Sequence, residues 1–130
     1  MNISTLKTLP IIKCDFDGTI VVERFPSVGE PLEMALETLD KFQFYKYPTI
    51  LWTCREGDPL LDAVDFLHQN KIYFDVVNMN HPMNPFKHLG TPRKPYANYH
   101  LDDKQFGGLP HWQVIHDYFF VEKKYHELFK

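Results

Sequence analysis

The feature that most constrains the fold of this chain is a set of four short apolar runs. A helical pattern lies between the first and the second run, and another between the second and the third. The runs predict β-strands over residues 11–15, 48–53, 74–78 and 99–103. Apolar residues recur at helical spacing between Pro31 and Phe42, and again from Asp58 to about Asn70. Strands that alternate with helices favour right-handed crossovers and a parallel sheet. The sequence therefore predicts an α/β fold, a three-layer Rossmann-like domain around a mainly parallel central sheet.

A last helical pattern extends from roughly His111 to Phe129 and is dense in aromatic side chains. It carries more apolar surface than one helix face needs to pack on a sheet. A contact between copies of the chain, in a homo-oligomer, is a second explanation for this surplus. The 130 residues contain no repeat, low-complexity tract or linker. We therefore expect a single domain over residues 1–130.

Composition argues against several classes of protein. The formal net charge of −3 does not suit a nucleic-acid binder that works through a broad basic surface. No apolar stretch approaches the length of a membrane span, and the first ten residues lack the apolar core of a signal peptide. The two cysteines are too few for a disulfide framework. These features predict a cytoplasmic protein with neither a nucleic acid nor a membrane as its partner.

The first predicted strand ends in two carboxylates, in the segment Asp15-Phe16-Asp17-Gly18-Thr19. Successive side chains of a strand point to opposite faces, so Asp15 and Asp17 would share one side and Phe16 would pack on the other. Two neighbouring carboxylates repel each other unless a cation lies between them. The pair is therefore a functional candidate, and a solvated turn is the alternative interpretation.

Two other predicted strands also end in polar residues. Thr53 closes the second strand, and Asp102-Asp103 close the fourth. Ligands of parallel α/β sheets bind beyond the carboxyl ends of the strands, so we expect an active site at this edge. An ordinary β-branched strand residue is the alternative for Thr53. The alternative for the acidic pair is a cap on the following helix.

Taken in order, these segments resemble the four motifs of the haloacid dehalogenase (HAD) superfamily of phosphoryl-transfer enzymes. The segment 15–19 is similar to the first motif, residues 50–53 to the second, Lys94 to the third, and residues 100–103 to the fourth. The resemblance covers roughly residues 10–112. About thirty residues separate Thr19 from the second strand, which leaves no room for a large cap domain. The chain is therefore most similar to the small capless members.

The resemblance implies a Mg²⁺-dependent phosphatase that acts through an aspartyl-phosphate intermediate. Asp15 would be the nucleophile, because a carboxylate attacks phosphorus once the negative charge of the substrate is neutralised. Asp17 would protonate the leaving oxygen and later deprotonate the attacking water. The hydroxyl of Thr53 and the ammonium group of Lys94 would bind the phosphate.

The resemblance also implies a Mg²⁺ site, for which oxygen ligands are suited. The expected ligands are Asp15, the backbone carbonyl of Asp17, and Asp102 or Asp103. The sequence leaves open which member of the acidic pair contacts the metal.

The identity of the phosphate-binding lysine is also open. Arg93 is adjacent to Lys94, and Lys87 and Lys104 are near it in the sequence. Arg55 follows Thr53 by two residues, and we expect its side chain to be solvated rather than bound to substrate.

By analogy with the family, we expect small phosphorylated metabolites such as sugar phosphates as substrates. Two alternatives belong to other functional classes. A receiver-like signalling domain that accepts a phosphoryl group also joins acids, Thr and Lys at strand ends, but in a different order along the chain. A non-catalytic HAD-like binding module is the second alternative, although all four motif positions are filled.

Overall fold

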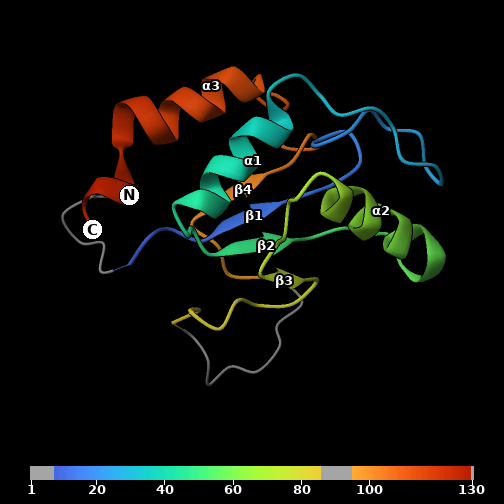
Figure 1. The fold of residues 1–130 in the computed structure, drawn as a ribbon, viewed down its shortest axis with the longest axis horizontal. Coiled ribbons are helices and arrows are strands. Elements are labelled where there is room, and N and C mark those ends of the chain that lie inside the picture. The colour runs from blue at the N-terminus through green and yellow to red at the C-terminus, as the bar shows by residue number, and fades with distance from the viewer. Residues whose placement is uncertain (1–7, 86–94, 130) are drawn as a thin grey trace.

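A computed structural model of the chain describes residues 8–85 and 95–129, in which four short strands form one sheet. The strands are β1 (Ile12–Cys14), β2 (Thr49–Leu51), β3 (Val76–Val77) and β4 (Tyr99–Leu101). They lie in the order β3-β2-β1-β4, and every neighbouring pair is parallel (Figure 1). The α/β, Rossmann-like fold is confirmed, and the described residues contain no large cap domain.

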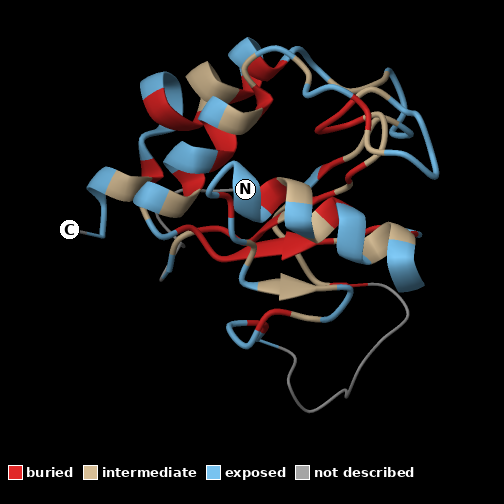
Figure 2. Cartoon of the chain, turned by 45° about the vertical axis from the view of Figure 1, so that its right-hand side comes forward, coloured by how far each residue is buried: buried red, intermediate tan, exposed pale blue. Residues whose placement is uncertain are grey.

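The two central strands form the middle of the core. Ile12 and Cys14 of β1 and Ile50 and Leu51 of β2 are fully buried, as the buried colouring of the central strand in Figure 2 illustrates. A strand covered on both faces has little solvent-exposed surface, and these strands are accordingly mostly apolar, with Lys13 of β1 only partly buried. This packing explains why the strands are recognisable from apolar runs alone.

Three α-helices accompany the sheet in the described part of the chain: α1 (Ala35–Phe44), α2 (Gly57–Gln69) and α3 (Trp112–Asp117). Helices α1 and α3 lie together above the sheet in Figure 1, and the segment after β3 lies below it. Leu39 and Phe42 are the buried apolar residues at the centre of α1, and Leu67 has the same role in α2. None of the helices in these residues combines the length and apolarity needed to cross a membrane.

Helix α1 begins later than the apolar periodicity predicts. The segment from Pro31 to Met34 is not helical, because it pairs with the chain that follows β1. The backbone N–H of Leu32 donates to the carbonyl of Ile20 at 2.8 Å, and Pro31 forms an isolated bridge with Val21. Met34 then adopts a left-handed conformation with φ of 68° before the helix starts.

The predicted continuous helix from His111 to Phe129 is wrong. Helix α3 passes into a π-helical segment, Tyr118–Lys123, and a 3₁₀ turn follows at Tyr125–Glu127. The wider π turn allows the consecutive rings of Phe119 and Phe120 both to be buried. Lys124, with φ of 51°, ends the π segment.

The aromatic side chains of this C-terminal segment pack mostly inside the chain itself. Trp112, Phe119, Phe120 and Tyr125 are buried, and the hydroxyl of Tyr125 lies 2.6 Å from that of Tyr99. Intramolecular packing therefore accounts for most of the surplus apolar surface. A homo-oligomer through this segment remains a prediction.

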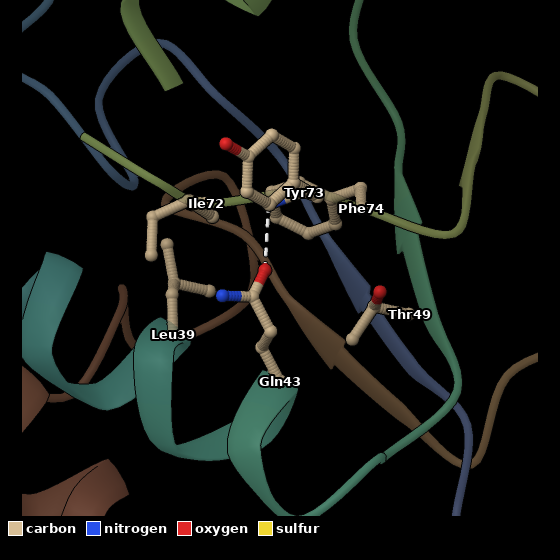
Figure 3. A pocket seen from close by; sticks show the side chains of 6 residues that line it. All are labelled: Leu39, Gln43, Thr49, Ile72, Tyr73 and Phe74. Atoms are coloured by element: carbon tan, nitrogen blue, oxygen red, sulfur yellow. Dashed lines mark hydrogen bonds between the residues drawn. The ribbon is translucent and has the colours of Figure 1, made fainter. Parts of the chain in front are cut away.

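A small cavity near the amino end of β2 separates α1 from the chain that leads into β3 (Figure 3). Gln43 of α1 spans this gap: its Oε1 accepts a hydrogen bond from the Tyr73 backbone N–H at 2.7 Å, and its Nε2 donates to the Lys71 carbonyl at 2.8 Å. The cavity volume is about 10 Å³, room for a single water at most. This end of the sheet is thus closed by internal packing.

Candidate functional site

The register of the sheet brings the ends of three strands to one place. Cys14 at the end of β1 pairs with Leu51 of β2 and with Leu101 of β4. The residues that follow these strands therefore leave the sheet side by side. Their side chains include three carboxylates, each with an oxygen within 4.8 Å of the others: Asp15, Asp102 and Asp103.

The pKa of Asp15 reflects first its burial and then the neighbouring carboxylates. Burial raises the pKa of the Asp15 carboxyl from 3.8 to about 6. A hydrogen bond from the Phe16 backbone N–H lowers the pKa, and the negative charges of Asp102 and Asp103 raise it. An ionised Asp15 is therefore costly here, and a cation placed among the three carboxylates would remove that cost.

Thr19 holds two members of this carboxylate cluster. Its fully buried hydroxyl oxygen lies 3.4 Å from Asp15 Oδ2 and 3.2 Å from Asp103 Oδ1, and it accepts the Asp103 backbone N–H at 2.9 Å. The indole N–H of Trp112 donates to the Thr19 carbonyl at 2.7 Å, so α3 supports the loop from behind. Sequence reasoning assigned no role to Thr19 or Trp112; the position of Thr19 next to the two acids was the only signal.

Gly18 allows the acidic loops to approach each other. Its φ is 78°, a left-handed conformation that side chains disfavour. A Cβ atom at this position would overlap the carboxylate of Asp103. The glycine is therefore required both by its backbone conformation and by the close packing of Asp103.

Asp17 is bound by a buried arginine rather than joining the other carboxylates. Arg55 donates from Nε to Asp17 Oδ2 and from Nη2 to Oδ1, both at 2.8 Å. Its remaining N–H groups donate to the carbonyls of Pro26, Ser27 and Pro59 at 2.7–3.0 Å. The Arg55 side chain is 1% exposed, so the expectation of a solvated arginine is wrong. The physical reason is that one carboxylate and three carbonyls supply acceptors for all five donors.

Thr53 is fixed by its neighbours at the end of β2. Its backbone N–H donates to Asn78 Oδ1 at 2.8 Å, and its hydroxyl oxygen accepts the Arg55 backbone N–H at 3.1 Å. Asn78 adopts a left-handed conformation with φ of 54°, which directs the amide back toward the β2 loop. The Thr53 hydroxyl proton forms no hydrogen bond within the part of the chain that the structure describes.

These residues line one open cavity of about 620 Å³, a size that suits a small ligand. The described residues around it are Asp15, Asp17, Glu23, Phe25, Thr53, Cys54, Arg55, Asp102, Asp103 and Lys104. Five of the predicted site residues thus share one cavity. Lys94 lies outside the described residues. Lys104 lines the cavity in the described part of the chain, with its Nζ 3.7 Å from Asp103 Oδ2.

A scan against protein-family models finds no match, and a search of the curated proteins also finds none. A search of the solved structures finds a conserved protein from Bacteroides thetaiotaomicron. The two chains are 34% identical with a TM-score of 0.77, over 95% of this chain and 99% of the other. The chain belongs to the family of this conserved Bacteroides protein.

The similarity extends over the whole α/β domain, because it covers nearly the full length of both chains. This similarity establishes the family and the fold, and it assigns no activity, substrate or cofactor to the chain.

Proposed function

We propose that this protein is a Mg²⁺-dependent phosphatase that hydrolyses small phosphate monoesters, such as sugar phosphates, through an aspartyl-phosphate on Asp15. The observation that carries the proposal is the carboxylate cluster of Asp15, Asp102 and Asp103 in the same cavity as Asp17 and Thr53. This set matches the HAD-like motifs of the sequence. It also supplies the nucleophile, acid and phosphate-binding groups that phosphoryl transfer requires.

The donor chemistry of the cluster fits Mg²⁺. Three carboxylates offer hard oxygen ligands within 4.8 Å of one another, a donor set that suits Mg²⁺. Asp15, Asp102 and Asp103 would hold the ion, together with the backbone carbonyl of Asp17. When bound, Mg²⁺ would neutralise the negative charge of the carboxylates and of a phosphate.

Asp15 would attack the phosphorus atom. Its carboxylate lines the cavity, and the Thr19 hydroxyl next to Oδ2 restricts its orientation. A new bond would form between a carboxylate oxygen of Asp15 and phosphorus while the bond from phosphorus to the leaving oxygen breaks.

Asp17 would act as the general acid and base. The bidentate contact with Arg55 fixes its carboxylate at the cavity wall, where the side chain is 18% exposed. Each oxygen keeps a second lone pair, and a proton carried there would pass to the leaving oxygen, after which Arg55 would stabilise the Asp17 carboxylate that remains. Asp17 would then accept a proton from the water that attacks the aspartyl-phosphate.

Thr53 and Lys104 are the phosphate-binding groups that the described residues support. The hydroxyl proton of Thr53 is available, and the ammonium group of Lys104 stands at the same cavity. Lys94, the residue indicated by the motif order, stays a prediction for the same role.

The test is release of phosphate from 4-nitrophenyl phosphate with and without Mg²⁺, by wild-type protein and by Asp15→Asn. We expect turnover that needs Mg²⁺ and is lost in Asp15→Asn. Asp65→Asn is the matched control, because Asp65 is an exposed carboxylate of α2 that does not line the cavity.

Two outcomes contradict the proposal and separate the alternatives. Stable phosphorylation of Asp15 without turnover would favour a receiver-like signalling domain. No turnover together with no stabilisation by Mg²⁺ would favour a non-catalytic binding module.

A further inference from the structure

We propose that Phe25 is a stacking platform that selects phosphate monoesters whose leaving group carries a flat aromatic ring. The inference rests on the proposed phosphatase function and names the substrate class of the same cavity. It starts from an apolar ring that lies among charged groups: Phe25 lines the cavity together with Asp15, Thr53 and Lys104, yet it is 55% exposed.

The ring of Phe25 is held in place although it is exposed. The guanidinium carbon of Arg55 lies over the ring, 5.2 Å from its centroid. The same guanidinium donates to the carbonyls of the next two residues, Pro26 at 3.0 Å and Ser27 at 2.7 Å. Three contacts from one buried side chain therefore position the ring and the backbone beside it.

Arg55 also connects Phe25 to the hydrophobic core. Arg55 also lies over the ring of Phe16, again 5.2 Å from the centroid, and Phe16 is fully buried. Its guanidinium is therefore in contact with a core ring and with a ring at the cavity surface. A flat ligand ring placed on Phe25 would extend this series of stacked planar groups.

A pre-positioned aromatic surface suits a planar ligand better than a sugar. A planar π-system stacks on a phenyl ring and displaces water from both faces, whereas a hydroxylated sugar keeps its water. Because the ring of Phe25 is already ordered by Arg55, binding orders little further. The cavity volume of about 620 Å³ has room for a phosphate at the acidic end and a ring system on Phe25.

The experiment compares two esters that share the phosphate and the ribose but differ in the aromatic base: adenosine 5′-monophosphate and ribose 5-phosphate. The measurement is kcat/KM for phosphate release with Mg²⁺. We expect wild-type protein to prefer the nucleotide by about tenfold, the range of one stacked base. Phe25→Leu should lower kcat/KM for the nucleotide by about tenfold and leave ribose 5-phosphate within about twofold.

Two further variants serve as controls. Phe25→Tyr keeps a flat ring and should keep the preference. Phe44→Ala removes an exposed phenyl ring of α1 that is not part of the cavity, and it should change neither rate constant. The melting temperature of each variant checks that it is folded.

Different outcomes contradict the proposed role of Phe25 and the proposed phosphatase activity. The proposed stacking role of Phe25 is contradicted if wild-type protein has equal kcat/KM for the two esters, or if Phe25→Leu loses kcat/KM equally for both. Neither result contradicts the proposed phosphatase activity. No phosphate release from either ester or from 4-nitrophenyl phosphate by folded wild-type protein with Mg²⁺ overturns both proposals.

Discussion

At the amino ends of β2, β3 and β4 several polar side chains form hydrogen bonds with one another, whereas at the carboxyl ends carboxylates lie close together. Thr49 and Asp75 exchange hydrogen bonds of 3.2 and 3.1 Å, and His81 donates to the same Asp75 at 2.8 Å. The hydroxyl of Tyr99 lies 2.8 Å from that of Tyr118 and 2.6 Å from that of Tyr125.

At the carboxyl ends of the strands, negative charges outnumber the nearby positive charges among the described residues. Asp15, Asp102 and Asp103 place like charges within 4.8 Å, and the cation nearest to them in the described chain is the largely exposed Lys104. Such an arrangement of like charges is unfavourable for folding. The amino end of the sheet thus gains stability from its hydrogen bonds, whereas the carboxyl end carries the electrostatic cost at the place where we propose the active site.

The largest expected effect is that of Asp15→Asn, which should separate the two roles at the carboxyl end. We expect kcat for phosphate release to fall by at least about 10⁴-fold, because the nucleophile is lost. In Mg²⁺-free buffer at pH 8 the same variant should unfold at a higher temperature, because one of three crowded charges is removed. Phosphate release and thermal unfolding measure the two effects. A lower melting temperature of Asp15→Asn would contradict the conclusion that the three carboxylates destabilise this end of the sheet.

Arg55→Met should show that one ion pair at this end is nevertheless structural. The substitution leaves the Asp17 carboxylate and three backbone carbonyls without their donors, which should cost about 3–5 kcal/mol of unfolding free energy. Urea denaturation measures this loss. Lys104→Met, which alters an exposed cation of the same cavity, is the control and should change stability by less than about 0.5 kcal/mol. Equal effects of the two variants would contradict the buried role of Arg55.

The stability of the metal-free protein should depend on pH through Asp15. The pKa of this carboxyl is about 6 in the folded protein and near 3.8 in the unfolded chain. Between pH 3.8 and about pH 6 the folded state therefore binds more protons than the unfolded state. The free energy of unfolding should therefore fall as pH rises from about 4 to about 6, by about 1–2 kcal/mol after allowance for solvent screening.

Melting temperatures of wild-type protein and Asp15→Asn from pH 4 to 7 test this dependence, and the difference between them should grow over that interval. Stabilisation by Mg²⁺ should be larger at pH 7 than at pH 5, because an ionised carboxylate is the ligand. A difference that stays constant with pH would show that Asp15 ionises as an ordinary carboxyl.

The smallest effect is expected for Tyr99→Phe at the amino end. Loss of the hydroxyl that Tyr118 and Tyr125 share should cost about 1 kcal/mol of unfolding free energy, the net value of a hydrogen bond. The value of kcat/KM should be unchanged, because this ring lies at the opposite end of β4 from Asp102. Urea denaturation and phosphate release measure the two quantities. A clear loss of activity would mean that the ends of the sheet are coupled.

Sequence reasoning predicted the strands and their polar ends, because both follow from local patterns. The apolar residues of the two central strands are buried, and Asp15, Thr53 and Asp102 directly follow predicted strands. The C-terminal segment shows where such patterns stop being sufficient. Its aromatic density predicted one long helix, whereas the burial of the adjacent Phe119 and Phe120 occurs in a π-helical turn.

By itself, the sequence determined the α/β order of the elements, the parallel sheet and the presence of acids at its carboxyl edge. Only the tertiary structure decided how these acids divide, with Asp15 beside Asp102 and Asp103 and with Asp17 bound to Arg55. The physical reason is that the acceptors of Arg55 come from residues 17, 26, 27 and 59, which no local periodicity connects. The same contacts position Phe25 at the cavity, so the proposed substrate preference also depends on the tertiary structure.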